Sequence, residues 1–147
     1  MTYCVGVLLD GGMVFASDSR TNAGVDHVSS FRKMTVYERP GDRVIVILSS
    51  GNLSVTQNAI NLFESRARRG DSAENLWTAP SLFDVASMLG DALREVKSRD
   101  AAYLAQNNID ASANFILGGQ VKGEQQRLFM LYQEGNFIEA MAETPFF

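Results

Sequence analysis

A threonine follows the initiator methionine, and a small residue in this position is usually exposed when that methionine is removed. Thr2 would then carry a free α-amino group beside its own hydroxyl, so that one residue supplies both a nucleophile and a base. An α-amino group has a pKa of about 7.7–8.0, and a nearby lysine ammonium would lower it enough for the amine to accept the hydroxyl proton near pH 7. Threonine is also a common strand residue, so its presence at position 2 is compatible with either a catalytic or a structural role.

The other reactive side chains are few. The single histidine, His27, follows Asp26 in a polar segment, where a solvated side chain is expected rather than a member of a Ser-His-Asp triad. The single cysteine, Cys4, falls in a predicted strand, where a small buried thiol is the usual outcome. One histidine and one cysteine exclude zinc sites of the usual ligand number, and the sequence contains no phosphate-binding loop or HExxH motif. No metal or organic cofactor is expected.

Strands are predicted in two blocks, from runs of β-branched, aromatic and aliphatic residues that end in glycine-rich or proline-containing turns. Four precede the helices and three follow them: 2–9, 13–17, 33–38 and 43–48, then 113–117, 127–132 and 137–140. Thr2 would thus open the first strand of an N-terminal hairpin, whose turn is Asp10-Gly11-Gly12. The polar segment 19–30 is assigned no strand.

Two helices are predicted between the blocks of strands. The first begins at a cap formed by Asn52 or Ser54 and continues to about residue 69, where Gly70 ends it. The second is capped by Ser81, with Asp84 in its first turn, and its apolar residues repeat at the helical period to beyond residue 100. Blocks of strands and helices in this order predict an α+β layered sandwich rather than a doubly wound parallel sheet.

Composition narrows the class of protein. The 147 residues predict a single domain, 1–147, large enough to hold itself together without disulfides or metals. A net charge of −4 argues against nucleic acid or an anionic membrane as the main partner. Neither a membrane span nor a secretory signal is visible in the sequence, and a single cysteine fits a reducing compartment. The expected location is the cytoplasm.

Several segments together resemble the proteasome β-subunit family of N-terminal-nucleophile hydrolases. They are Thr2-Tyr3-Cys4-Val5, Ala16-Ser17-Asp18-Ser19-Arg20, Phe31-Arg32-Lys33-Met34, Ser50-Gly51 and Asn114-Phe115-Ile116-Leu117-Gly118-Gly119. Within the family, the stretch from Ser17 to Asp26 is most similar to the bacterial branch called Anbu. The resemblance implies the αββα sandwich of this family. Because its subunits continue well past the equivalent of Phe147, it also implies that the C-terminal end of the domain is truncated here.

The resemblance also implies a set of catalytic residues. The nucleophile corresponds to Thr2, the active-site aspartate to Asp18 and the lysine to Lys33, with Arg20 supporting the last two. A lysine ammonium near Thr2 would lower the pKa of its hydroxyl and amine, and Asp18 would hold that ammonium in place.

Further residues are assigned to the substrate. The family's Gly-Gly before the first helix appears here as Ser50-Gly51, whose backbone N–H groups would stabilise the oxyanion of a tetrahedral intermediate. Leu48 corresponds to a residue of the first specificity pocket and implies an apolar preference there. Thr21 and Ser49 lie in stretches that would pair with the substrate as an added strand.

The function implied is that of a threonine-type endopeptidase that cleaves unfolded polypeptide after loss of Met1. Its subunits would assemble with identical copies into rings or helical turns, and an ATP-dependent unfoldase is a further partner by family analogy alone. Two alternatives remain open at this point. One is an N-terminal-nucleophile amidohydrolase acting on small amides, and the other is a non-catalytic structural subunit or scaffold, which the early end of the chain favours.

Overall fold

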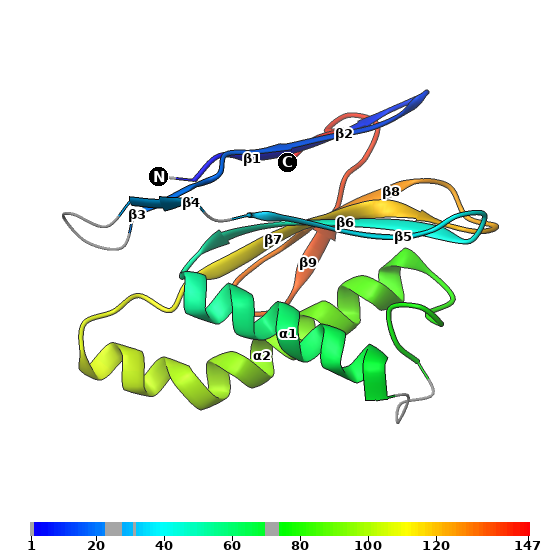
Figure 1. Cartoon of the computed structure of the whole chain (residues 1–147). Helices are drawn as coiled ribbons and strands as arrows, with labels where there is room; N and C mark the ends of the chain where they lie inside the picture. Colours follow the sequence, from blue (N-terminus) through cyan, green and yellow to red (C-terminus); the bar gives the residue numbers. More distant parts are fainter. Residues whose placement is uncertain (1, 23–27, 31, 70–73) are drawn as a thin grey trace.

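A five-stranded antiparallel sheet lies between a β-hairpin on one side and two helices on the other (Figure 1). The computed structural model describes residues 2–22, 28–30, 32–69 and 74–147, and for residues 21, 22 and 28–30 it describes the backbone alone. The sheet has the strand order β5-β6-β7-β8-β9, and its strands are β5 (Met34–Arg39), β6 (Arg43–Gly51), β7 (Ala113–Val121), β8 (Arg127–Leu131) and β9 (Phe137–Glu139). The hairpin consists of β1 (Cys4–Leu9) and β2 (Gly12–Ser17). The predicted α+β class is therefore confirmed.

The central strands are apolar on both faces because both faces are covered. In β6, Ile45 and Ile47 belong to the core under the helices, whereas Val46 and Leu48 belong to the core under the hairpin. Successive side chains of a strand point to opposite faces, so this alternation assigns each residue of β6 to one layer. Burial of each such side chain contributes about 1.5–3 kcal/mol, which makes the two cores the main force that holds the three layers together.

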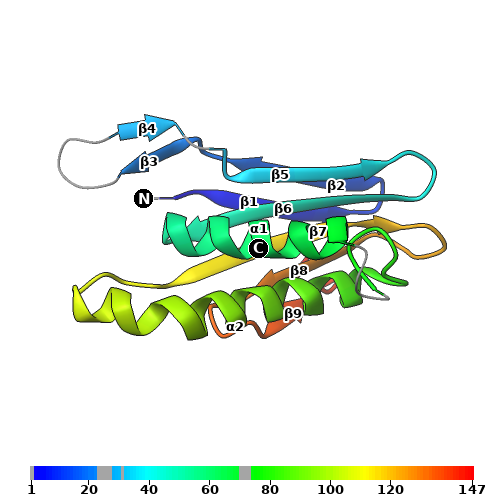
Figure 2. The same ribbon diagram turned by 60° about the horizontal axis from the view of Figure 1, so that its bottom comes forward.

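The helices begin where their capping residues predict. Asn52 Oδ1 accepts hydrogen bonds from the backbone N–H groups of Ser54 and Val55, at 3.0 and 3.2 Å, and starts α1 (Leu53–Arg69). Ser81 caps α2 (Leu82–Gln106) by accepting from the backbone of Asp84 at 3.1 Å. The two helices lie side by side across one face of the sheet (Figure 2). Neither of these helices of the described chain is long and apolar enough to cross a membrane.

Three predictions about strands were wrong. The segment 19–30 contains a short hairpin, β3 (Arg20–Asn22) with β4 (Val28–Ser30). Strand β1 starts at Cys4 instead of residue 2, which leaves Thr2 just ahead of the strand. The strand predicted for 113–117 continues through Gly118 and Gly119 in β7, and a Cβ on Gly118 would come too close to Phe15 and Met13 of the hairpin. The small residue lets the hairpin side chains pack directly on the sheet at this point.

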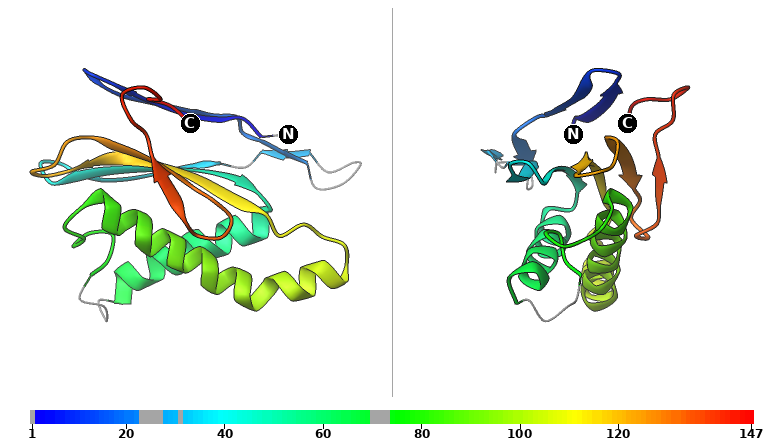
Figure 3. Two further views of the ribbon diagram at one scale, coloured as in Figure 1. Left: turned by 180° about the vertical axis from the view of Figure 1, so that it is seen from behind. Right: turned by 90° about the vertical axis from the view of Figure 1, so that its right-hand side faces the viewer.

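The two ends of the chain meet in the hairpin layer (Figure 3). Residue 147 pairs with Gly6 through two backbone hydrogen bonds of 3.0 Å, and Leu8 N–H donates to the carbonyl of Pro145 at 2.7 Å. The C-terminal residues therefore add to the edge of β1 opposite β2. Three of the four layers of the expected αββα sandwich are present, in the order hairpin, sheet, helices. On the outer face of the hairpin, side chains such as Val5 and Val14 are exposed.

Candidate active site

The ammonium group of Lys33 connects the hairpin layer to the sheet layer. Its Nζ donates to Thr2 Oγ1 at 3.1 Å and to both carboxylate oxygens of Asp18, at 2.9 and 3.0 Å. Only 7% of the Lys33 side chain is exposed. The structure thus brings together the three residues that the sequence assigned to nucleophile, lysine and aspartate, and it places a buried positive charge against the hydroxyl of Thr2.

Strand pairing positions Thr2 and Asp18 beside each other. The register of the hairpin pairs Cys4 with Ser17, and the next pair is held by two further bonds. Tyr3 N–H donates to Asp18 Oδ1 at 3.0 Å, and Asp18 N–H donates to the Tyr3 carbonyl at 3.0 Å. The Asp18 carboxylate is therefore fixed one residue away from Thr2. The role of Tyr3 was not predicted, although the register of the predicted hairpin, continued by one pair, indicates it.

Lys33 is positioned from the sheet. It directly precedes β5, and its carbonyl accepts from the backbone N–H of Ser49 at 2.9 Å. The Ser49 carbonyl in turn accepts from Cys4 Sγ at 3.5 Å. These bonds join β6, the start of β5 and the start of β1, so the end of the sheet determines where the lysine side chain begins.

The surroundings of Asp18 and of Cys4 shift their pKa values in opposite directions. The hydrogen bonds from Lys33, and next from the Tyr3 backbone, lower the pKa of Asp18 below its usual value. Burial raises the pKa of the Cys4 thiol, although Lys33 acts in the opposite direction. Cys4 is therefore held as a thiol, which agrees with a structural role for it.

A cavity of about 330 Å³ opens beside Thr2 on the hairpin side of the sheet. Its wall includes Leu48, which is fully buried, and Ser50 from β6. Met130 and Phe147 also line it, and neither was predicted. Phe147 could not have been found from the sequence, because it reaches the site only through the pairing of the C-terminal residues with β1.

The backbone at Gly51 is directed toward the site. Ser49 N–H bonds toward β5 and Asn52 N–H bonds toward β7, to the carbonyl of Ser112 at 2.7 Å. Since N–H groups alternate along a strand, the N–H of Gly51 is directed to the β5 side, where β5 has not yet begun and Lys33 lies. Gly51 has φ +101°, and a Cβ there would collide with the carbonyl of Ser112. This backbone conformation requires glycine.

Three further residues were predicted for the site: Arg20, Ser49 and Thr21. The Arg20 side chain is exposed and makes no ion pair with any described residue, and only its backbone contributes to the low pKa of Asp18. Ser49 lies on the helix side of β6, and its N–H donates to the carbonyl of Lys33. Thr21 pairs with Ser29 in β3, and its side chain lies outside the described residues, as does the whole of His27.

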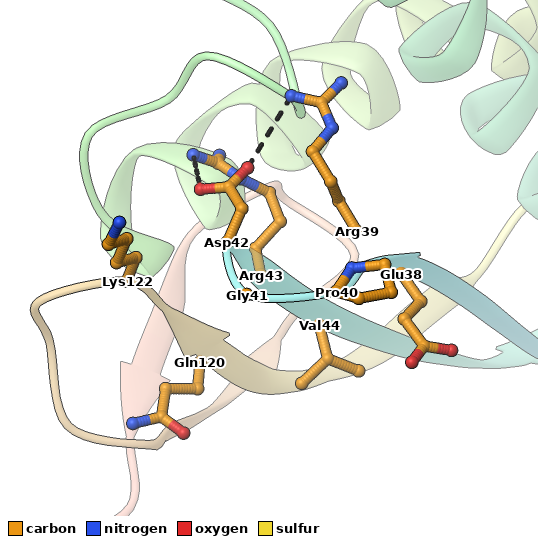
Figure 4. Close-up of a pocket in the computed structure, with 9 residues that line it drawn as sticks. All are labelled: Glu38, Arg39, Pro40, Gly41, Asp42, Arg43, Val44, Gln120 and Lys122. Atoms are coloured by element: carbon orange, nitrogen blue, oxygen red, sulfur yellow. Dashed lines mark hydrogen bonds and ion pairs between the residues drawn. The ribbon is translucent and has the colours of Figure 1, made fainter.

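The opposite end of β5 and β6 has another hollow, of about 360 Å³, around the turn that joins them (Figure 4). The two arginines that line it, Arg39 and Arg43, contact the segment before α2. Arg43 donates to the carbonyls of Leu76 and Ala79 at 3.0 Å, and the guanidinium of Arg39 lies 4.8 Å from the centre of the Trp77 ring. These contacts anchor the segment before α2. Within the ranges described, no cluster of three or more His, Cys, Asp or Glu side chains could hold a metal ion.

Comparison with solved structures gives relatives among the Anbu proteins. No family model matches the chain, and none of the curated proteins does. Among solved structures, Anbu (ancestral β-subunit) from Yersinia bercovieri is 45% identical, with a TM-score of 0.90. The Anbu complex from Pseudomonas aeruginosa, solved as a helical assembly, is 44% identical, with a TM-score of 0.91. Each match covers 100% of this chain and 59% of the other chain.

Proposed function

Because the chain belongs to the Anbu branch of the proteasome β-subunit family, we propose that it is a threonine-type endopeptidase subunit whose nucleophile is Thr2 after removal of Met1. The observation that carries this proposal is the position of Lys33 Nζ, 3.1 Å from the Thr2 hydroxyl and paired with Asp18. When Thr2 is the N-terminal residue, a buried lysine next to its hydroxyl can stabilise the negative charge that forms there as the hydroxyl loses its proton to the α-amine.

The proposed reaction has two stages. The Thr2 hydroxyl attacks the peptide carbonyl while the free α-amine of the same residue accepts its proton, and the tetrahedral intermediate expels the amine product, which takes up a proton. The resulting ester on Thr2 is then hydrolysed by water, which releases the acid product and restores the hydroxyl. The ammonium of Lys33 stabilises negative charge that develops on Thr2 Oγ1, and the N–H of Gly51 stabilises the oxyanion.

We also propose that the active form is a homo-oligomer. The supporting finding is the relative from Pseudomonas aeruginosa, which was solved as a helical assembly. Confinement of the active sites inside such a particle would restrict cleavage to unfolded polypeptide. The apolar cavity beside Thr2, with Leu48 in its wall, supports a preference for an apolar substrate residue.

Intact mass spectrometry tests the nucleophile directly. The purified chain is measured before and after treatment with a peptide epoxyketone, a reagent that reacts with both the hydroxyl and the free amine of an N-terminal threonine. The expected result is a mass without Met1 that gains one adduct, located on Thr2 by peptide mapping. Retention of Met1 would favour the scaffold, and turnover of small amides without turnover of peptides would favour the amidohydrolase.

A further inference from the structure

Two polar groups at the cavity beside Thr2 lack hydrogen-bond partners. The hydroxyl of Ser50, which lines this cavity from β6, forms no hydrogen bond with any residue that the structure describes. The backbone nitrogen of Thr2 likewise donates to no residue in the described part of the chain. Most of the remaining wall is apolar and includes Phe115, Ile116 and Met130. Polar groups in such surroundings are usually hydrogen-bonded, so these two are candidates to pair with each other.

The packing of the hairpin on the sheet brings Thr2 to the end of β6. Cys4 Sγ donates at 3.5 Å to the carbonyl of Ser49, which belongs to the peptide that joins Ser49 to Ser50. The start of β1 therefore lies over this peptide. Side chains two residues apart in an extended chain point the same way, so Thr2 faces the sheet on the same side as Cys4. Lys33 donates to Thr2 Oγ1 from the β5 side, and Ser50 offers a hydroxyl from β6 itself.

Tyr132 carries another hydroxyl of the cavity wall but starts farther away. It follows β8, and β7 lies between β8 and β6. Neighbouring strands are about 4.8 Å apart, so the backbone of Tyr132 lies two strand spacings from that of Ser50. Lys33, the partner of Thr2, precedes β5 on the other side of β6. Ser50 is therefore the closer of the two hydroxyls to Thr2.

We propose that Ser50 is a catalytic residue, whose hydroxyl oxygen accepts a hydrogen bond from the free α-amine of Thr2 and so directs the lone pair of that amine to the Thr2 hydroxyl. The inference rests on the proposed function. When the amine takes the proton from Thr2 Oγ1, it becomes an ammonium group near the positive charge of Lys33, and the Ser50 oxygen stabilises this new charge. Ser50 itself neither gives nor takes a proton.

The hydrogen bond should be visible in the pKa of the α-amine. An acceptor for the ammonium form raises this pKa, as does the negative charge of Asp18, whereas the charge of Lys33 lowers it. Cys4 and Tyr132 are the other titratable side chains of the cavity wall, and burial raises the pKa of the Cys4 thiol. Loss of the Ser50 hydroxyl should therefore lower the pKa of the amine and make it a weaker base.

The pKa of the amine can be measured without any cleavage of a substrate. The chain is made with a removable leader that leaves Thr2 as the first residue, and acetylation of the amine by acetic anhydride is followed against pH by mass spectrometry of the N-terminal peptide. We expect Ser50→Ala to lower this pKa by about 1, the effect of one hydrogen bond to a charged group, and to slow adduct formation with the epoxyketone by about tenfold. Ser50→Thr keeps the hydroxyl and should restore both.

A matched variant controls for the loss of a serine hydroxyl elsewhere. Ser65 is half-buried like Ser50, but its hydroxyl donates to the carbonyl of Leu62 within α1 at 2.9 Å, so Ser65→Ala should change neither measurement. An unchanged pKa of the amine in Ser50→Ala would overturn the assignment, even if adduct formation became slower, because a structural role alone gives that result. A fall in this pKa in Tyr132→Phe instead of Ser50→Ala would also overturn it.

The two measurements separate this inference from the proposed function. A lower pKa of the amine in Ser50→Ala, together with no adduct on Thr2 of the wild type, would leave the hydrogen bond of Ser50 standing and refute the nucleophile. An adduct on Thr2 of the wild type, together with the same pKa of the amine in Ser50→Ala, would refute the role of Ser50 and leave the nucleophile standing.

Discussion

Lys33 Nζ and Thr2 Oγ1 lie 3.1 Å apart although 31 residues separate them in the sequence. Lys33 starts from the end of the central sheet, and Thr2 belongs to the hairpin that packs on that sheet. The contact between them therefore depends on the packing of the two layers, through side chains such as Leu48 and Phe15. Any change that shifts the hairpin on the sheet should affect the proposed chemistry before it affects the helices.

Replacement of the nucleophile should abolish reactivity and leave the fold intact. In Thr2→Ala the methyl group cannot attack a carbonyl, so neither an epoxyketone adduct nor peptidase activity is expected. Thr2→Ser keeps a hydroxyl beside the α-amine and should retain measurable activity. Circular dichroism and thermal unfolding of both variants provide the folding control, and turnover by Thr2→Ala at the wild-type rate would contradict the assignment.

Removal of the lysine charge should be nearly as damaging. Lys33→Met keeps an unbranched side chain of similar length but lacks the ammonium that faces Thr2 Oγ1, and the rate of adduct formation should fall by about 10²–10³-fold. Arg94→Met, on the exposed side of α2, controls for the loss of one positive charge. Adduct formation by Lys33→Met within a few-fold of wild type would show that Lys33 is structural only.

The Lys33–Asp18 ion pair should make stability depend on acidic pH. The folded pKa of Asp18 lies below its ordinary value of 3.8, so the carboxylate contributes stability at pH values above 3.8, and this contribution is lost as the pH falls through the folded pKa. The melting temperature of wild type should therefore fall more steeply between pH 5 and pH 2 than that of Asp18→Asn. If the melting temperatures of the two proteins fall in parallel with pH, the ion pair with Lys33 does not stabilise the fold.

Gly51→Ala should destabilise the protein and remove the proposed oxyanion donor from its position. The positive φ costs about 1–2 kcal/mol for alanine, and the added Cβ would also collide with the Ser112 carbonyl. Gly41→Ala is a matched control, because Gly41 also has a positive φ, of +77°, but a Cβ there meets nothing within 4 Å. Chemical denaturation should show a larger loss for Gly51→Ala, and equal losses would contradict the close contact at Ser112.

Local chemistry in the sequence was enough to predict most of the elements. Asn52 or Ser54 was predicted to cap the first helix and Ser81 the second, because a side-chain oxygen near a helix start satisfies free N–H groups whatever the rest of the chain does. The hairpin was predicted from a turn between two β-rich runs. By contrast, the β3–β4 pair lies in a polar segment without strand periodicity, and Gly118 is part of a strand because it pairs with β6 and β8, a pairing that its own residue type does not predict.

The sequence by itself determined the kinds of residue available for chemistry and, through its resemblance to a family, named Thr2, Asp18 and Lys33. It could not show their distances, because contacts across 15 or 31 residues arise only when two layers pack. The tertiary structure alone decided that Ser49 faces the helices and is bonded to Lys33, and that Phe147 returns to line the cavity of the nucleophile. The side of a strand that a residue faces depends on its register with its neighbours, and a one-residue change in register reverses it.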